Sequence, residues 1–254
     1  MLEAPRGERR PLKRFPLLKL DPELGRALPD SERRRAECAL LVPTVTVPVG
    51  PWEAPREPPR GTELGLLVLE GQLIREVAIA RSRSLELLGH GDLIRPWQED
   101  ACSFCDSGWR VLDRSRLAVL DDNFARALAQ WPQLVTALIE RTLRRSRFMA
   151  VEAAVSNVVG VEQRILSLFW QLAEKWGRRE DDGVVVTIKL THQLFADVVG
   201  ARRPSVTQAL GRLVEAGAVE ARTDGCWLLK GQAPPSAAGD LGPVGPGGNG
   251  ATAG

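Results

Sequence analysis

Basic, hydroxyl and amide side chains recur between residues 190 and 225, interleaved with apolar ones. Guanidinium groups bind phosphates, and guanidinium and amide groups also hydrogen-bond to base edges in the major groove of DNA. These residue types therefore predict a DNA-binding surface, provided that the chain turns them outward. The candidate DNA-binding residues are Thr191, Arg202, Arg203, Ser205, Thr207, Gln208, Arg212, Arg222 and Thr223.

Two short helices joined by a tight turn would position these side chains. Thr191 is a favourable N-cap, Gly200 suits a left-handed residue that ends the first helix, and Pro204 suits the first turn of a second helix over 203–216. Apolar residues at helical spacing define the inward faces. They are Leu194, Phe195, Val198 and Val199 in the first helix and Val206, Leu210, Leu213 and Val214 in the second.

A plain helical hairpin with solvated arginines would show the same periodicity, so the residues that follow are needed to separate the two interpretations. Residues 218–220 and 226–229 read as short strands on either side of Thr223-Asp224-Gly225, which is a hairpin turn signal. A helix-turn-helix followed by a β-hairpin is a winged helix, and this favours the DNA-binding interpretation.

Residues from about 62 to 230 resemble the Crp/Fnr family of bacterial transcription regulators. The run THQLFADVVGARRPSVTQALGRLVEAGAVEA, preceded by a strand at 184–190, matches the helix-turn-helix and wing of that family in order and spacing. A weaker match is Leu88-Gly89-His90-Gly91-Asp92-Leu93, which resembles the glycine-aspartate turn of the family's β-roll. The resemblance implies an α+β fold with an N-terminal antiparallel β-roll of the cyclic-nucleotide-binding type, a long dimerisation helix and a C-terminal winged helix-turn-helix.

Composition and patterning suggest how the chain divides. We expect a solvated extension over 1–36, rich in Pro, Arg and Glu, a β-roll sensory domain over 37–122, and a dimerisation helix region over 123–158. The winged helix-turn-helix is expected over 159–230, with a charged loop at 178–183. Residues 231–254 are rich in Gly, Pro and Ala and predict a disordered tail.

A long helix is expected from Pro132 to about Asn157. Along it, moderate and small side chains follow a repeat close to seven residues, which is typical of a helix that pairs with a copy of itself. The family resemblance favours a parallel homodimer, although the same face could pack against the β-roll of its own chain. The seam residues are Val135, Ile139, Thr142, Ser146, Met149 and Ala153.

The family's cyclic-nucleotide contacts are missing from this sequence. Nucleotide-binding members follow the glycine-aspartate turn with a Gly-Glu pair for the ribose and then an Arg for the phosphate. Here the turn leads to Arg95-Pro96-Trp97, no basic residue occurs between Arg95 and Arg110, and Met149-Ala150 replaces a Thr-Ser pair. An enclosed phosphate without a cation is costly. Arg95 could serve another anion, but we expect Arg95 and Trp97 to cover the surface of the roll, and the sequence does not identify an effector.

The second helix also departs from the family's Arg-Glu-x-x-x-Arg pattern. The corresponding residues run from Arg203 through Pro204 to Gln208. Arg203 can still bind guanine O6 and N7, whereas Pro204 cannot accept from cytosine and the Gln208 amide favours adenine. Arg202, Ser205, Arg222 and Thr223 are better placed for phosphates, so the operator should differ from the usual half-site of the family.

The sequence gives little support for a metal site, a cofactor or an enzyme active site. Cys102-Ser103-Phe104-Cys105 is a C-x-x-C pair, but Cys38 and Cys226 lie in other regions, so we expect no metal and no cofactor, and cysteines in their reduced form. The only histidines, His90 and His192, are far apart in sequence, and this argues against an enzyme. With 44% hydrophobic and 26% charged residues and a net charge of only +2, any affinity for DNA must come from local clusters of arginine.

The predicted function is a DNA-binding transcription regulator that acts as a homodimer and reads half-sites roughly 34 Å apart. RNA polymerase is a further partner that the resemblance allows. No apolar run is long enough to cross a membrane and no signal peptide is evident, so we expect a cytoplasmic protein without a membrane partner. The alternative is a small-molecule-sensing or protein-interaction module whose winged helix contacts protein rather than DNA.

Overall fold

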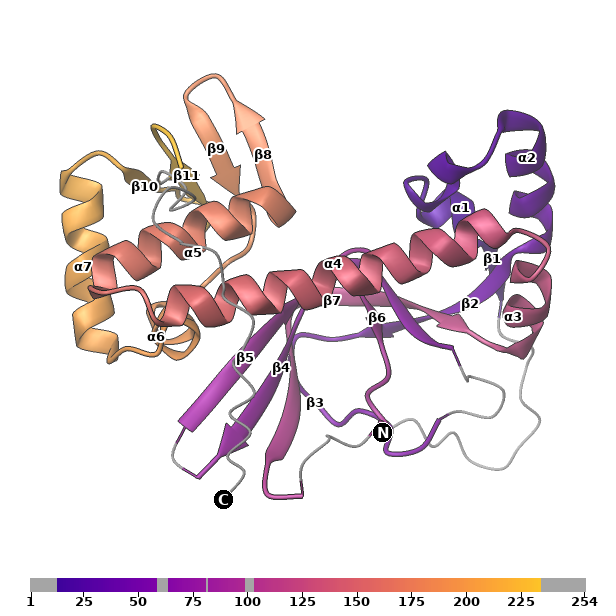
Figure 1. The fold of residues 1–254 in the computed structure, drawn as a ribbon, viewed down its shortest axis with the longest axis horizontal. Helices are drawn as coiled ribbons and strands as arrows, with labels where there is room; N and C mark the ends of the chain where they lie inside the picture. Colours follow the sequence, from indigo (N-terminus) through magenta and orange to yellow (C-terminus); the bar gives the residue numbers. More distant parts are fainter. Residues whose placement is uncertain (1–12, 59–63, 81, 99–102, 234–254) are drawn as a thin grey trace, which may run out of the picture.

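A computed structural model describes residues 13–58, 64–80, 82–98 and 103–233. A strand-rich domain lies along one side of the long helix α4 (Pro132–Ser156), and a smaller helical domain lies at the C-terminal end of that helix (Figure 1). This is the expected α+β arrangement of β-roll, long helix and winged helix-turn-helix. The expected tail lies outside the described residues except for 231–233. None of the described helices is long and apolar enough to cross a membrane.

The β-roll is an antiparallel sheet with strand order β1-β2-β7-β4-β5, in which β3 also pairs with β7 and β6 with β4. Residues 65–79 form one long strand that is irregular around Gly71, and residues 106–120 form a second long strand that pairs with it. Gly71 has φ +85°, and a Cβ there would collide with Ser115. The strands are β1 Arg14–Pro16, β2 Leu41–Val47, β3 Gly50–Trp52, β4 Gly65–Ile79, β5 Ser82–Leu88, β6 Leu93–Ile94 and β7 Asp106–Leu120.

The N-terminal segment is packed, and the prediction of a solvated extension over 1–36 is wrong for residues 13–36; residues 1–12 lie outside the described part. The segment contains β1, α1 (Leu17–Leu20), the 3-10 helix η1 (Leu24–Ala27) and the start of α2 (Asp30–Ala39). Its composition is polar on average, but the few leucines are spaced so that they all reach one core. Those buried against α3 and α4 are Leu17, Leu18, Leu24, Leu28 and Ala36.

A buried ion pair ties this segment to α4. Asp21 is fully buried, and the Arg141 guanidinium binds both of its carboxylate oxygens, with Nη2 3.0 Å from Oδ1. His90 Nε2 lies 3.6 Å from the same Oδ1, and the Leu24 amide donates to it over 3.2 Å. Burial alone would raise the pKa of Asp21, but the hydrogen bonds from His90 and Arg141 hold it well below its usual range. The Asp21 contact in turn raises the pKa of His90.

The helices between the β-roll and the C-terminal domain begin and end at residues that suit helix ends. Helix α3 (Asp122–Leu128) begins at Asp121, whose carboxylate accepts from the Phe124 amide over 3.0 Å, and α4 begins at Pro132 as predicted. Helix α5 (Val161–Trp176) ends before Gly177, and four apolar residues of its inner face are buried. They are Ile165, Leu168, Phe169 and Leu172.

The C-terminal domain adds a small sheet with strand order β10-β11-β9-β8. The predicted charged loop at 178–183 is instead a β-hairpin of β8 (Gly177–Glu180) and β9 (Gly183–Val186), because the valine run at 184–186 extends as a strand and pairs back onto residues 177–179. Helices α6 (His192–Val199) and α7 (Arg203–Glu215) and strands β10 (Val219–Ala221) and β11 (Trp227–Leu229) complete the domain.

Candidate nucleic-acid interface

The turn between α6 and α7 has the geometry that its residues predict. The Thr191 hydroxyl accepts from the Leu194 amide over 3.2 Å and caps α6. Gly200 ends α6 in the left-handed region, with φ 61° and ψ 43°, which costs a glycine little. Arg164 of α5 donates to the Val199 carbonyl over 2.7 Å, so the end of α6 is also held from outside the motif.

An aromatic cluster fixes α6 against α5 and the wing. The ring centroids of Phe169 and Phe195 are 5.0 Å apart, and those of Phe169 and Trp227 are 5.3 Å apart. Both phenylalanines are fully buried. Because Trp227 lies on β11, one cluster fixes the helix-turn-helix and the wing together, and the exposed face of α7 is presented on a rigid support.

The predicted polar residues at the start of α7 are turned toward solvent. The five at its N-terminal end are all exposed, as expected of a helix that enters a groove. On the inner face Val206, Leu210 and Leu213 are buried as predicted, but Val214 is 43% exposed and Ala209 is buried in its place. The reason is geometric, since 206, 209, 210 and 213 follow helical spacing and 214 falls to one side. The exposed residues are Arg202, Arg203, Ser205, Thr207 and Gln208.

Besides Thr191, three of the predicted DNA contacts have partners within the chain. Arg212 Nε lies 2.8 Å from Glu162 at the start of α5, and Arg222 Nη1 lies 2.7 Å from Glu180 on β8. The Thr207 hydroxyl lies 3.0 Å from His192 Nδ1. Arg212 therefore links α7 to α5, and Arg222 links the wing to β8. To bind DNA, each arginine would have to exchange its carboxylate partner for a phosphate.

Lys189 is a basic residue of this surface that the motif did not include. It is exposed in the segment before α6, and its side chain lies over Gly225 in the wing turn, next to Thr223. A single lysine between two apolar residues, Ile188 and Leu190, was the only signal in the sequence. Its position adds a cation between the wing and the start of α6.

Comparison with known proteins places residues 163–230 in the family of Crp-like helix-turn-helix domains. The chain therefore carries a Crp-like helix-turn-helix domain. Its segment of 92 residues is 28% identical to the global nitrogen regulator of Synechococcus elongatus, covering 35% of this chain and 40% of that regulator. The matched segment thus spans less than half the length of the curated relatives.

Solved structures extend the likeness in fold to most of the chain. A cyclic nucleotide-binding domain containing protein from Listeria monocytogenes is 15% identical with a TM-score of 0.62, over 84% of this chain and 98% of that one. FixK2 from Bradyrhizobium japonicum is 14% identical with a TM-score of 0.56, over 75% and 93%. At this level of identity the structures show a shared fold, including the β-roll.

Within the roll, apolar side chains pack where the strands face one another. Val68, Leu73 and Val111 are buried there, and Trp52 and Trp109 stack edge to face with centroids 5.8 Å apart. Arg95 lies outside this cluster, is exposed, and donates from Nε to the Leu64 carbonyl over 3.0 Å. Trp97 packs against the cluster from its rim.

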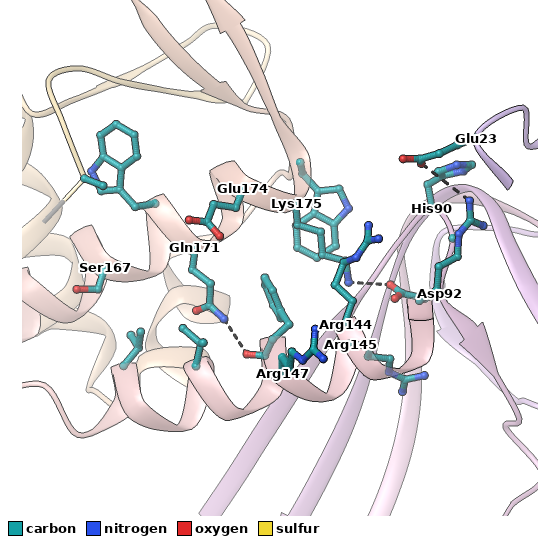
Figure 2. A pocket seen from close by; sticks show the side chains of 18 residues that line it. Glu23, His90, Asp92, Arg144, Arg145, Arg147, Ser167, Gln171, Glu174 and Lys175 are labelled. Carbon is teal, nitrogen blue, oxygen red and sulfur yellow. Dashed lines mark hydrogen bonds and ion pairs between the residues drawn. The ribbon is translucent and has the colours of Figure 1, made fainter. Parts of the chain in front are cut away.

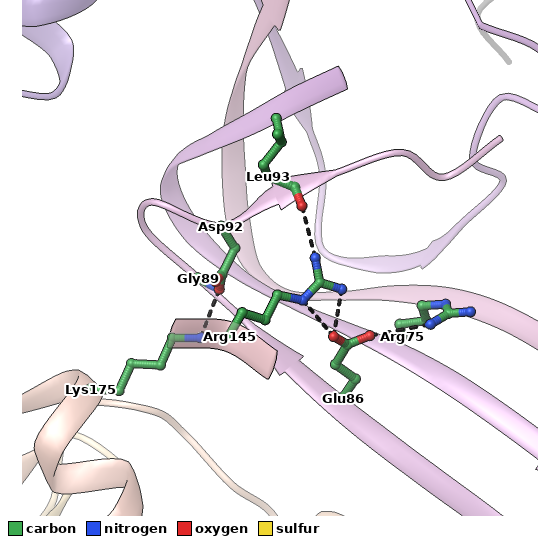
Figure 3. A network of polar contacts seen from close by, with 7 residues as sticks. All are labelled: Arg75, Glu86, Gly89, Asp92, Leu93, Arg145 and Lys175. Atoms are coloured by element: carbon green, nitrogen blue, oxygen red, sulfur yellow. Dashed lines mark hydrogen bonds and ion pairs between the residues drawn. The ribbon is translucent and has the colours of Figure 1, made fainter. Parts of the chain in front are cut away.

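Polar contacts join the roll to α4 and to the DNA-binding domain (Figure 3). Lys175 of α5 lies 2.8 Å from Asp92 in the roll turn, and Asp92 also accepts from the Gly89 amide over 2.7 Å. Arg145 of α4 binds Glu86 over 2.5 Å and donates to the Leu93 carbonyl over 2.8 Å. Ion pairs and hydrogen bonds of charged side chains therefore connect the roll to both helices, to α5 at the turn 89–92 and to α4 at Glu86 and Leu93.

The cysteines differ from expectation in one respect. Cys38 is exposed and free and Cys226 is buried and free, but Cys105 is disulfide-bonded rather than reduced. Cys102, the other cysteine of the C-x-x-C pair, lies outside the described residues. Among the described residues, no group of His, Cys, Asp and Glu has the arrangement of a metal site.

Proposed function

We propose that the chain is a transcription regulator that binds double-stranded DNA as a homodimer and places α7 in the major groove. The observation that carries this proposal is the row of exposed side chains at the N-terminal end of α7, on a helix whose opposite face is buried. Guanidinium, hydroxyl and amide groups at that end of a second helix suit both phosphates and base edges.

Within this proposal the residues divide by role. Arg203 and Gln208 read bases, and Arg202, Ser205 and Thr223 bind phosphates, as does Lys189 beside the wing. Thr191 at the start of α6, Thr207, Arg212 and Arg222 contribute where their intramolecular partners release them. A winged helix that docked on protein instead would not need this much unpaired positive charge around α7.

Substitution of the reading residues should weaken binding selectively. We expect Arg203→Ala and Gln208→Ala each to cost about 1–3 kcal/mol on the cognate site and to relax preference at one base pair, because each removes a contact to base edges. Arg202→Ala should weaken all sequences alike and reduce the salt slope by about one. The measurement is selection of sites from random DNA, followed by titration at several salt concentrations.

Arg114→Ala is a matched control for the loss of one exposed arginine, since Arg114 lies on the β-roll, far from α7 in the sequence. It should leave both the affinity and the selected motif unchanged. If Arg203→Ala bound the same motif with the same affinity as the original chain, α7 would not be the reading helix.

Cyclic AMP and cyclic GMP should bind weakly or not at all at physiological concentration. Arg95 is committed to the Leu64 carbonyl at the surface, and the facing side chains of the roll are apolar. A phosphate brought among them would lose its hydration without gaining a cation. Isothermal titration calorimetry on the full chain tests this expectation, and binding of either nucleotide at micromolar concentration would contradict it.

A further inference from the structure

A cavity of about 660 Å³ lies where the roll turn, α4 and α5 meet (Figure 2). Its walls come from segments far apart in the sequence, namely the turn at 90–92, residues 141–155 of α4 and residues 167–176 of α5. Its volume falls within the range of sites for small molecules, roughly 300–1,000 Å³. The apolar cluster inside the roll is a separate region, since none of its residues lines this cavity.

Two guanidinium groups that line the cavity stand outside its internal ion pairs. Arg141, Arg145 and Lys175 are neutralised by Asp21, Glu86 and Asp92. Arg144 and Arg147 also line the cavity, and neither has a carboxylate partner among the described residues. Of the lining carboxylates, only Glu174 likewise lacks an ion pair in that part of the chain. Glu23 is a second carboxylate on Arg141, 3.9 Å away. Arg144 and Arg147 lie one helical turn apart on α4, so a single carboxylate of a ligand could bind both guanidinium groups.

A buried hydrogen-bond acceptor next to the cavity is unsatisfied. The Gln171 side chain is 8% exposed, and its Nε2 donates to the Phe148 carbonyl over 2.9 Å, while its Oε1 is buried with no partner. Figure 2 shows Gln171 extending from α5 toward α4 across this space. A buried carbonyl oxygen without a donor is costly, and a ligand N–H or O–H would remove that cost once the Gln171 side chain turns its oxygen toward the cavity.

Aromatic side chains supply the remaining wall. Phe148 of α4 and Trp170 and Trp176 of α5 line the cavity, and the rings of Phe148 and Trp176 pack edge to face with centroids 5.9 Å apart. Such walls favour a flat apolar group that can stack between the two helices.

We infer that this cavity binds a small organic monoanion that carries an aromatic ring and one hydrogen-bond donor. Arg144 and Arg147 bind the carboxylate, Gln171 Oε1 accepts the donor, and the aromatic wall holds the ring. On α4 the cavity residues lie on a different face from the seam residues Ile139 and Ser146, as the 100° step per residue requires. A dimer formed through that seam therefore leaves the cavity open.

Calorimetry on the full chain, without DNA, tests the site with matched probes. Indole-3-acetate has the ring, the carboxylate and an N–H, indole-3-acetamide lacks the charge, and 1-methylindole-3-acetate lacks the donor. 4-Hydroxybenzoate and its amide repeat the charge comparison on a smaller ring. We expect at least one acid to bind with a Kd below about 1 mM, and both its amide and its donor-free analogue to bind about tenfold more weakly.

Variants assign the binding to this cavity. Arg144→Gln and Arg147→Gln should each weaken the acid about tenfold, and Arg114→Gln, on the roll, should leave it unchanged. Gln171→Leu should remove the difference between indole-3-acetate and its methylated analogue. If Gln171→Leu fails to fold, the comparison of the two ligands on the unsubstituted chain still tests the donor. Absence of binding by every acid, or binding that ignores both arginine variants, would overturn the inference.

A ligand here would couple the roll to the DNA-binding domain, because Asp92 and Lys175 lie on opposite walls and are paired 2.8 Å apart. This consequence rests on the proposed function, and it predicts that the bound acid changes DNA affinity. Acid binding that leaves DNA affinity unchanged would refute the coupling alone. Failure of DNA binding with intact acid binding would refute the proposed function alone.

Discussion

Asp21→Ala is expected to lower the free energy of unfolding by about 3–5 kcal/mol, the usual cost of removing one partner from a buried ion pair. Asp21 is fully buried and Arg141 is largely so, which means that the substitution leaves an interior guanidinium with only the half-exposed Glu23, 3.9 Å away, as its counter-charge. It also removes the acceptor of the Leu24 amide. Urea unfolding at neutral pH, monitored by circular dichroism, measures the change.

Two comparisons identify the ion pair as the cause. The double variant D21A/R141A should be less destabilised than the sum of the two single variants, because neither charge is then left alone. Asp30→Asn, which breaks an exposed pair with Arg33 at 3.3 Å, should cost at most about 1 kcal/mol. Strictly additive single variants would show that the pair contributes nothing specific.

The contribution of Asp21 to the free energy of unfolding should decrease as the pH is lowered into the acid range. Because its pKa is lowered in the folded chain, its stabilisation is complete above the ordinary carboxyl pKa of about 3.9 and is lost as the pH falls toward the folded value. His90 acts oppositely, since its pKa is raised. Its contribution is complete below about 6.5 and is lost as the pH rises through the folded value.

The helix-turn-helix could be predicted from the sequence because its signals are local. Thr191, Gly200 and Pro204 each determine backbone geometry within a few residues, and all three act as expected. The N-terminal segment could not be predicted in this way. Its leucines pack against α3 and α4, about a hundred residues later, and Asp21 finds its partner at Arg141. Average composition carries no information about such contacts.

In the candidate DNA-binding site, too, some features follow from local sequence and others only from tertiary contacts. Exposure of Arg203 and Gln208 follows from helical periodicity, whereas the pairing of Arg212 with Glu162 and of Arg222 with Glu180 depends on tertiary packing. The cavity could not be predicted either, because Gln171 reads as an ordinary polar residue of an amphipathic helix. Only its burial beside Phe148 reveals an acceptor without a donor.

The seam of α4 remains the basis for the proposed dimer. Ile139 is 54% exposed and Leu143 is 50% exposed, on the side of the helix opposite the buried residues Leu134 and Leu138 and flanking Ser146. The sequence prediction chose Thr142 rather than Leu143 beside Ile139, and the exposed leucine makes this face more apolar than expected. Two such helices, paired in parallel, would cover each other's apolar side chains.

Ile139→Asp should therefore shift the protein toward monomer, raising the dimer dissociation constant roughly 30- to 800-fold, or about 2–4 kcal/mol, because two carboxylates would be buried facing each other at the twofold axis. Ile139→Val, which keeps the face apolar, should retain the dimer. Ile79→Asp makes the same change at another exposed isoleucine, at the end of β4, and should leave assembly unchanged. Sedimentation equilibrium measures all three. A dimer of Ile139→Asp as tight as that of Ile79→Asp would show that the chain does not pair through α4. The two copies of α7 would then need another interface to reach half-sites about one turn of DNA apart.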